Sequence, residues 1–291
     1  MRPMHLEPEC LPCLRRLVEL TVSLATPEPE LRRRAYEAAW ALVEAEMGPG
    51  AIPALIANHF HRLIRELTGN ADPFLLRKQA ETALLARLAR QVIPNPPPAE
   101  LGALLTLAAL GNALDFFRPE AEVSQEIMKP PDFALWHGEA FAEALAQGPG
   151  LMLYLADNAG EQYFDLPLVQ GLRALGWEVI YVVKGGPVQN DLTREDLTAS
   201  GLATALAPVA DTGAQTVGLL LGECSPEFRE LYARARLILA KGMGHFETLG
   251  HLPDPRLFFL LQAKCAPVAG ALGVPQGSFV LLWSPAVTPG R

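Results

Sequence analysis

The stretch LMLYLADNAGEQYFD, residues 151–165, changes within a few positions from apolar to acidic and then to an amphipathic pattern. Its first six residues, Leu151 to Ala156, have the length and composition of a buried parallel strand. The next five, DNAGE, form a tight polar turn, and a helical pattern follows. The sequence therefore predicts a strand, an acidic turn and a helix, as in an α/β fold.

The acidic turn allows two interpretations. In a doubly wound sheet the turn after a strand lies at the carboxyl edge, where ligands bind, and Asp157 and Asn158 offer oxygens that suit Mg²⁺ or Mn²⁺. Alternatively, Asp157 or Asn158 caps the helix and Glu161 complements the helix dipole. The turn alone does not decide between these interpretations.

Composition restricts the classes of protein to consider. Half of the 291 residues are hydrophobic, and 24 basic against 32 acidic residues give a net charge of −8. An acidic chain without a basic run is not expected to bind nucleic acid or an anionic membrane. No apolar run is long enough for a membrane span and the first residues lack a signal-peptide core, so we expect a cytoplasmic protein.

The hydrophobic periodicity changes after Gly148. Helical segments with short breaks precede it, including one from Pro98 to Phe117 and a broken one from Asp132 to Ala146. We predict a helical domain over residues 1–147 and a Rossmann-like, three-layer α/β domain with a mostly parallel sheet over 148–291. The expected strands are LMLYLA (151–156), EVIYVV (178–183), RLILA (236–240), LFFLLQA (257–263) and SFVLLW (278–283).

Two features of the helical region stand out. Cys10 and Cys13 form a lone C-x-x-C, which is half of a zinc site and lacks the preceding strand of a thioredoxin-type site. We therefore favour a structural or weakly metal-binding role over a redox role. Gly111, Asn112 and Asp115 interrupt an apolar helix, which indicates either a close helix contact or polar groups offered to the active site.

Polar clusters follow three successive strands. Asp191 comes after EVIYVV, and Lys241 and Gly242 come after RLILA, at the sheet edge where Asp157 is expected. Asp157, Asn158 and Asp191 would supply oxygens to a divalent cation, while Lys241 and the glycine amides would hold phosphate oxygens. This pattern favours phosphoryl chemistry, with Asp157 and Lys241 as catalytic residues.

These motifs, taken together, resemble a known family. The sequence is similar to the metal-dependent damage-control phosphatases, formerly a domain of unknown function, and in particular to the microbial branch with an N-terminal C-x-x-C. The matching pieces are CLPCLRR (10–16), RELTGNADPF (65–74), GNALD (111–115), DNAGE (157–161), NDLTRED (190–196), KGMGHFE (241–247) and LLQAKC (260–265).

The resemblance implies a cation-dependent hydrolase of small phosphometabolites such as sugar phosphates. It implies Mn²⁺, Co²⁺, Ni²⁺ or Mg²⁺ held by residues that match Asp157, Asn158 and Asp191, and a substrate site lined by Lys241 and Glu247. Gly242 and Glu161 are further candidates for substrate binding. So is His245, which stands where the family more often has Asn and which would either tune substrate choice or add a metal ligand.

Several alternatives stay open at this stage. We favour direct attack by metal-activated water, with Asp157 as a phosphorylated carboxylate as the alternative. The resemblance also implies a second candidate function, a carboxyl methyltransferase acting on acidic residues, although the turn after the first strand lacks a glycine-rich G-x-G. A non-catalytic metal or metabolite sensor is the third. The expected partner is a small phosphorylated metabolite, and homo-oligomer formation is left open.

Overall fold

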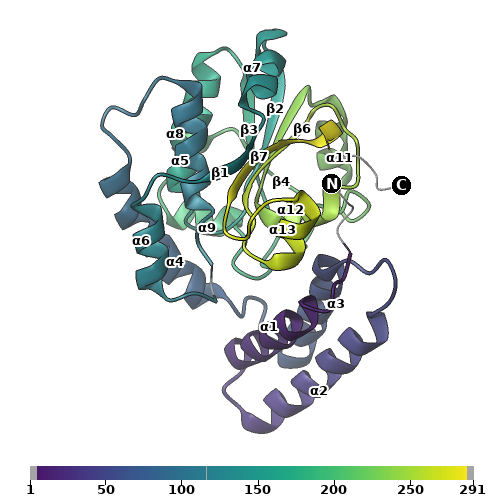
Figure 1. Cartoon of the computed structure of the whole chain (residues 1–291). Coiled ribbons are helices and arrows are strands. Elements are labelled where there is room, and N and C mark those ends of the chain that lie inside the picture. Colours follow the sequence, from purple (N-terminus) through teal and green to yellow (C-terminus); the bar gives the residue numbers. More distant parts are fainter. Residues whose placement is uncertain (1–4, 116, 287–291) are drawn as a thin grey trace.

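A seven-stranded sheet forms the centre of the molecule (Figure 1). The computed structural model describes residues 5–115 and 117–286. The strand order is β1-β7-β6-β5-β2-β3-β4, and the neighbouring pairs are parallel except β6 with β7. The mostly parallel sheet is therefore confirmed. Its strands are β1 (Phe133–Trp136), β2 (Leu151–Leu155), β3 (Glu178–Val183), β4 (Val209–Asp211), β5 (Leu237–Lys241), β6 (Leu257–Gln262) and β7 (Phe279–Trp283).

Helices cover both faces of the sheet (Figure 1). Along β2, Met152 and Tyr154 belong to the hydrophobic core on one face, and Leu153 and Leu155 to the core on the other. A strand buried on both faces has to be apolar throughout, which explains the continuous apolar run. The first core includes α4 (Leu75–Val92), α5 (Leu101–Gly111), α6 (Glu120–Ile127), α7 (Gly138–Ala146), α8 (Gln162–Ala174), α9 (Arg194–Ala199) and α10 (Ala203–Leu206); the second includes α11 (Pro226–Arg234), α12 (Gly242–Leu249) and α13 (Ala266–Leu272).

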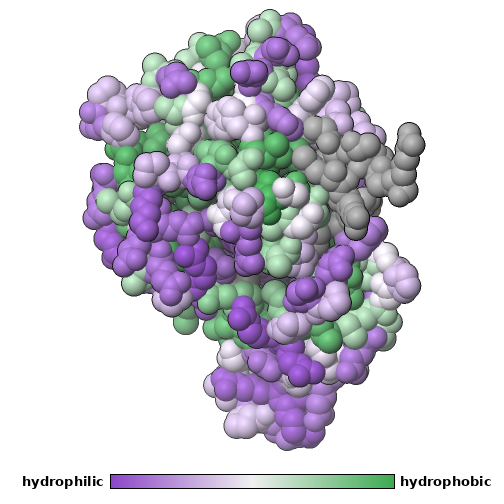
Figure 2. Space-filling view, in the orientation of Figure 1, coloured by the Kyte–Doolittle hydropathy of each residue, from purple (hydrophilic) through white to green (hydrophobic). Residues whose placement is uncertain are grey.

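The first three helices form a lobe with a core of its own. They are α1 (Cys10–Ala25), α2 (Pro29–Glu46) and α3 (Pro53–Thr68), and α3 ends at Gly69 in the left-handed conformation. Figure 1 shows this lobe at one end of the molecule, and on the face seen in Figure 2 its outer surface is mainly hydrophilic. The lobe contacts the α/β body through α3 and α12.

The expected boundary at 147/148 does not coincide with the division between the hydrophobic cores. The helices α4, α5 and α6 contribute to the same core as the sheet, although they precede residue 148. The strand β1 also precedes it and pairs with β7. By packing, the chain divides between α3 and α4, so the α/β body begins well before the change of periodicity at Gly148.

The five expected strands correspond to β2, β3, β5, β6 and β7. The helix predicted from Asp132 to Ala146 is wrong in its first part, because Phe133–Trp136 is strand β1 and only Gly138–Ala146 is helical. The three-residue strand β4 was also not predicted. Both strands lie at the ends of the sheet and are too short for periodicity to identify. Among the described helices, none combines the length and apolarity that crossing a bilayer requires.

Candidate active site

Backbone contacts hold the turns after β2 and β3 together at the carboxyl edge of the sheet. Asn158 and Asp191 form an antiparallel β-bridge, and the N–H of Leu192 donates to the carbonyl of Asp157 over 2.8 Å. The capping interpretation of the acidic turn is wrong, because α8 starts at Gln162 with Glu161 as its N-cap residue. Asp157 and Asn158 are thus available for another role.

Asp157 lies in a strongly acidic environment. Its Oδ2 accepts hydrogen bonds from Nδ2 of Asn158 at 2.8 Å and of Asn112 at 3.0 Å. Burial, together with the carboxylates of Glu161 and Asp191, raises the pKa of Asp157 to about 8. The negative charge of the carboxylates at this edge of the sheet therefore exceeds the positive charge of the lysines near them.

Asp191 faces a buried lysine that sequence reasoning had missed. Lys184 Nζ lies 3.3 Å from Asp191 Oδ2 and donates to the Gly218 carbonyl at 2.6 Å. Burial raises the pKa of Asp191, and Lys184 opposes that rise. Lys184 thus compensates part of the charge of Asp191, while Asp191 Oδ2 has no hydrogen-bond partner within the described residues.

His245 lies behind this pair, and it does not line the cavity described below. Its Nδ1–H donates to the carbonyl of Lys241 at 2.6 Å, and its Nε2 lies 3.4 Å from Nζ of Lys184. Burial and the charge of Lys184 lower the pKa of His245 far below its usual range, so the ring is neutral. His245 therefore lies away from the cavity in which its contact with substrate or metal was predicted, and its Nε2 faces Lys184 instead.

Asp157, Asn158 and Asp191 fit a hard divalent cation. They offer two carboxylates and one amide, and Nδ2 of Asn158 is turned toward Asp157 and Glu161, which leaves Oδ1 for a ligand. Oxygen donors of this kind are the usual ligands of Mg²⁺ and Mn²⁺. Within residues 5–115 and 117–286, no three His, Cys, Asp or Glu side chains form a metal-binding group, so the candidate site depends on the amide as its third ligand.

A cavity of about 260 Å³ opens onto these residues. Asp157, Asn158, Asp191 and Lys264 line it, and so does Glu247. The first three helices supply much of its apolar wall, through Leu14, Leu17, Pro53, Ala54 and Ala57. The cavity therefore lies between the lobe and the α/β body.

Lys241 is buried beneath the site, which contradicts its predicted role as a phosphate clamp. It is fully buried, and its Nζ donates to Ala108 O at 2.9 Å, Glu161 Oε2 at 2.9 Å and Asp165 Oδ1 at 2.6 Å. An ammonium group has three donors, and all three are used within the protein. Burial opposes the charge of Lys241, but Asp165 and Glu161 raise its pKa above the usual range.

Glu161 and Gly242 also lie outside the cavity lining. Glu161 is fully buried, and its Oε1 accepts from Nδ2 of Asn158 at 2.6 Å and of Asn112 at 2.9 Å. Gly242 has φ +79°, and a Cβ there would meet Asp157 Oδ2 at 1.9 Å. The two residues therefore shape the surroundings of Asp157, and neither lines the cavity in which the substrate contact was predicted.

The comparison with protein families decides the class of this protein. The family model described as the damage-control phosphatase ARMT1-like domain matches residues 6–280. The chain belongs to this family. The resemblance inferred from the motifs is thus confirmed, and family membership supports a phosphatase function.

Known members of the damage-control phosphatase family match over almost their whole length. A damage-control phosphatase of Pyrococcus horikoshii is 35% identical and covers 96% of this chain and 98% of its own. One of Archaeoglobus fulgidus is 28% identical over 95% of this chain and 98% of its own. The crystal structure of a DUF89 family protein from Pyrococcus horikoshii superposes with a TM-score of 0.84 at 34% identity, covering 97% and 99% of the two chains.

In this member of the family, the lysine that lines the cavity is Lys264 rather than Lys241. Lys264 follows β6, which is parallel to β5, and its Nζ donates to the carbonyl of Leu114. The charge of Lys264 acts to lower the pKa of Asp157, so Lys264 lies close to Asp157. The same strand-end argument that selected Lys241 could have identified Lys264 in the LLQAKC motif.

The GNALD segment combines both features that its sequence indicated, a polar group near the acidic turn at Asn112 and a close helix contact at Gly111. The Nδ2 of Asn112 reaches Asp157 and Glu161, and its Oδ1 accepts from the backbone N–H of Gln262 at 3.0 Å. At Gly111, an added Cβ would lie 3.0 Å from Cβ of Phe164, so the glycine serves a close contact with α8.

Thiols line the cavity from both sides, with Cys10 and Cys13 in α1 of the lobe and Cys265 before α13 in the α/β body. Cys10, Cys13 and Cys265 are free thiols in the lining, next to Glu247. Burial raises the pKa of each thiol, for Cys265 to about 12. Burial also raises the pKa of Glu247 to about 7, against the hydrogen bond from Ala54 N at 3.1 Å.

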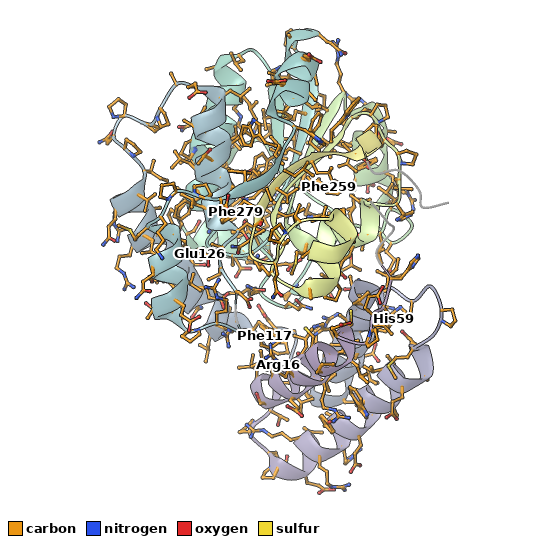
Figure 3. All side chains as sticks on the ribbon, in the orientation of Figure 1. Arg16, His59, Phe117, Glu126, Phe259 and Phe279 are labelled. Atoms are coloured by element: carbon orange, nitrogen blue, oxygen red, sulfur yellow. The ribbon has the colours of Figure 1, made fainter. Side chains whose placement is uncertain are left out.

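Figure 3 shows Arg16 of α1 and Phe117 adjacent at the junction of lobe and body. The guanidinium carbon of Arg16 lies 4.2 Å from the centre of the Phe117 ring, and both residues line the cavity. This cation–π contact places a positive charge at the cavity wall.

Proposed function

We propose that the protein is a divalent-metal-dependent phosphatase of small phosphomonoesters, such as sugar phosphates or damaged phosphorylated metabolites. One Mn²⁺, Co²⁺, Ni²⁺ or Mg²⁺ ion is the cofactor, with Asp157, Asn158 and Asp191 as its ligands. The observation that carries the proposal is the convergence of these three residues with Lys264 on one small cavity. A cavity of about 260 Å³ is of a size that suits a small phosphorylated metabolite.

The bound cation would polarise the phosphate and lower the pKa of a water molecule. The protein contributes position and charge. Asn112 and Asn158 fix the carboxylate of Asp157, and Lys184 forms an ion pair with that of Asp191. Lys264 supplies the positive charge that attracts phosphate oxygens, and Glu247 can accept or donate a hydrogen bond to the organic part of the substrate, since its pKa is about 7.

Water is the favoured nucleophile. A thiol attacks as the thiolate, and the raised pKa values of Cys10, Cys13 and Cys265 keep these groups protonated at neutral pH. The carboxylate of Asp157 is engaged by two amide groups and confined by Gly242, which limits the approach of phosphorus. Direct attack by water requires no covalent bond from the thiols or from the carboxylate of Asp157.

Phosphate release from p-nitrophenyl phosphate and a panel of sugar phosphates tests the proposal. Metal-free protein should be inactive, and Mn²⁺, Co²⁺, Ni²⁺ or Mg²⁺ should restore activity. Asp191→Ala should abolish it, whereas Asp211→Ala, a half-exposed aspartate on β4 outside the cavity, should leave it unchanged. Metal-independent release, or full activity of folded Asp191→Ala, would refute the proposal.

A further inference from the structure

Asn190 contributes a polar atom to the site that the protein itself does not satisfy. Its side chain is buried, with 1% of the residue exposed, and it lines the cavity next to Asp191. Its Nδ2 donates to Oε2 of Glu81 on α4 at 2.9 Å. Its Oδ1 is buried without a hydrogen-bond partner in the described part of the chain. A buried acceptor in this state calls for a donor that arrives from outside the protein.

Glu81 determines which way the amide of Asn190 faces. Arg77 Nε donates to Glu81 Oε1 at 3.0 Å, and this ion pair favours the charged carboxylate, although burial raises the pKa of Glu81. A carboxylate only accepts hydrogen bonds, so it requires the amide NH₂ of Asn190. Turning the amide by 180° would bring two oxygens together. The Oδ1 of Asn190 is therefore held on the side away from Glu81.

The backbone around Asn190 is also fixed. Its carbonyl accepts from the N–H of Ala159 in the turn after β2 at 2.8 Å. Gln189, which precedes it and also lines the cavity, has φ +45° and is the one non-glycine residue with positive φ in the described segments. Such a conformation costs about 1–3 kcal/mol and persists only where the surrounding structure imposes it. Strain of this kind is typical of ligand-binding sites.

The chemistry of the cavity limits what the donor can be. A buried carbonyl oxygen can be satisfied by a hydrogen-bond donor or by a cation. The cation is assigned to Asp157, Asn158 and Asp191, and a phosphate dianion brings only acceptors, so beside the phosphate the available donor is water. We propose that Asn190 Oδ1 accepts a hydrogen bond from the water molecule that attacks phosphorus, with Glu81 as the positioning residue that aims it. This inference rests on the proposed phosphatase function.

The step needs no further reactant. The oxygen of the water bonds to phosphorus and the ester P–O bond breaks. One proton of the water ends on the leaving alcohol oxygen, and the other stays on the released phosphate. Asn190 exchanges no proton, because its amide carbonyl only fixes the direction of one O–H bond.

Kinetics with Mn²⁺ and p-nitrophenyl phosphate test the assignment. Asn190→Leu keeps the approximate shape and removes the acceptor, so kcat should fall about 10²-fold, as expected when a reacting group is misplaced. KM and the Mn²⁺ affinity measured by calorimetry should not change. In the single variant Asn190→Asp, the new carboxylate would repel that of Glu81, so activity should fall. In the double variant with Glu81→Gln, the glutamine amide would donate to the new carboxylate, which keeps an acceptor oxygen at position 190, so kcat should recover.

Each other result contradicts the assignment. Loss of Mn²⁺ affinity in Asn190→Leu would make Asn190 a metal ligand, a rise in KM alone would make it a substrate contact, and wild-type kinetics would leave it no role. If Asn190→Leu does not fold, the double variant decides, and failure to recover kcat over Asn190→Asp overturns the inference. A wild-type protein that releases no phosphate refutes the proposed function as well, whereas an active wild type with an unaffected Asn190→Leu refutes this inference alone.

Discussion

Lys241 and Lys264 stand at the same edge of the sheet, one at the end of β5 and the other just after β6, yet their surroundings differ. The sequence predicts that each lysine lies at or near a strand end, but it does not show which way its side chain points. Lys241 turns under the sheet edge toward α5 and α8, where Glu161 and Asp165 surround it. Lys264 lies beyond its strand and reaches the cavity.

Substituting each lysine by methionine separates the two roles. Lys241→Met leaves two buried carboxylates without their cation and should lower the free energy of unfolding by about 3–5 kcal/mol. Lys264→Met should change stability little and lower kcat about 10²-fold, because it removes charge that faces the transferring phosphate. Urea unfolding and steady-state kinetics of both variants check this. A stable, inactive Lys241→Met protein would restore the original clamp hypothesis.

At the scale of the elements, the helix α5 delivers Asn112 to the acidic turn. The apolar sequence of α5 predicts a buried helix, and Gly111 predicts close packing, but the partner of that packing could not be read from the sequence. Contact with α8 depends on residues some 50 positions apart, and local periodicity carries no information about such pairs. The same limit hid β1, whose pairing partner is the distant β7.

Enlarging Gly111 should disturb the site through α5. Gly111→Val places side-chain atoms against Phe164, so it should cost about 1–3 kcal/mol of stability and displace Asn112 from Asp157. Gly270→Ala, in the exposed part of α13 with open space around it, is the control and should be neutral or slightly stabilising. Thermal unfolding and phosphate release would show the difference. Equal effects of the two substitutions would argue against close α5–α8 packing as the cause.

At the scale of the whole molecule, the lobe of α1, α2 and α3 closes one side of the cavity. Sequence reasoning brought Asp157, Asn158 and Asp191 together, because parallel strands end at a common edge. It could not predict the wall opposite them, since that wall depends on how two separate cores dock. Asn58 of α3 makes one of the docking contacts, accepting from Val217 N at 2.7 Å and donating to Val217 O at 3.3 Å.

Removing this contact should loosen the lobe. Asn58→Leu leaves the N–H and C=O of Val217 unpaired, at a cost of about 1–3 kcal/mol. Amide hydrogen exchange should quicken around Val217 and in α3, and KM should rise because the cavity wall becomes mobile. His59→Ala is the matched control, because His59 bonds Glu46 within the lobe. Unchanged exchange around Val217 in Asn58→Leu would mean that other contacts hold the lobe.

Calorimetric titration of metal-free protein with Mn²⁺ is the sharpest test of the proposal that Asp157, Asn158 and Asp191 bind a divalent cation. Below a pKa of about 8 a proton occupies Asp157 and competes with the cation, so affinity should rise between about pH 6 and about pH 9, with proton release near neutral pH. Asp191→Ala should abolish binding, and Asp211→Ala should not. Wild-type affinity in Asp191→Ala, or binding that is independent of pH and releases no proton, would mean that these residues do not form the cation site.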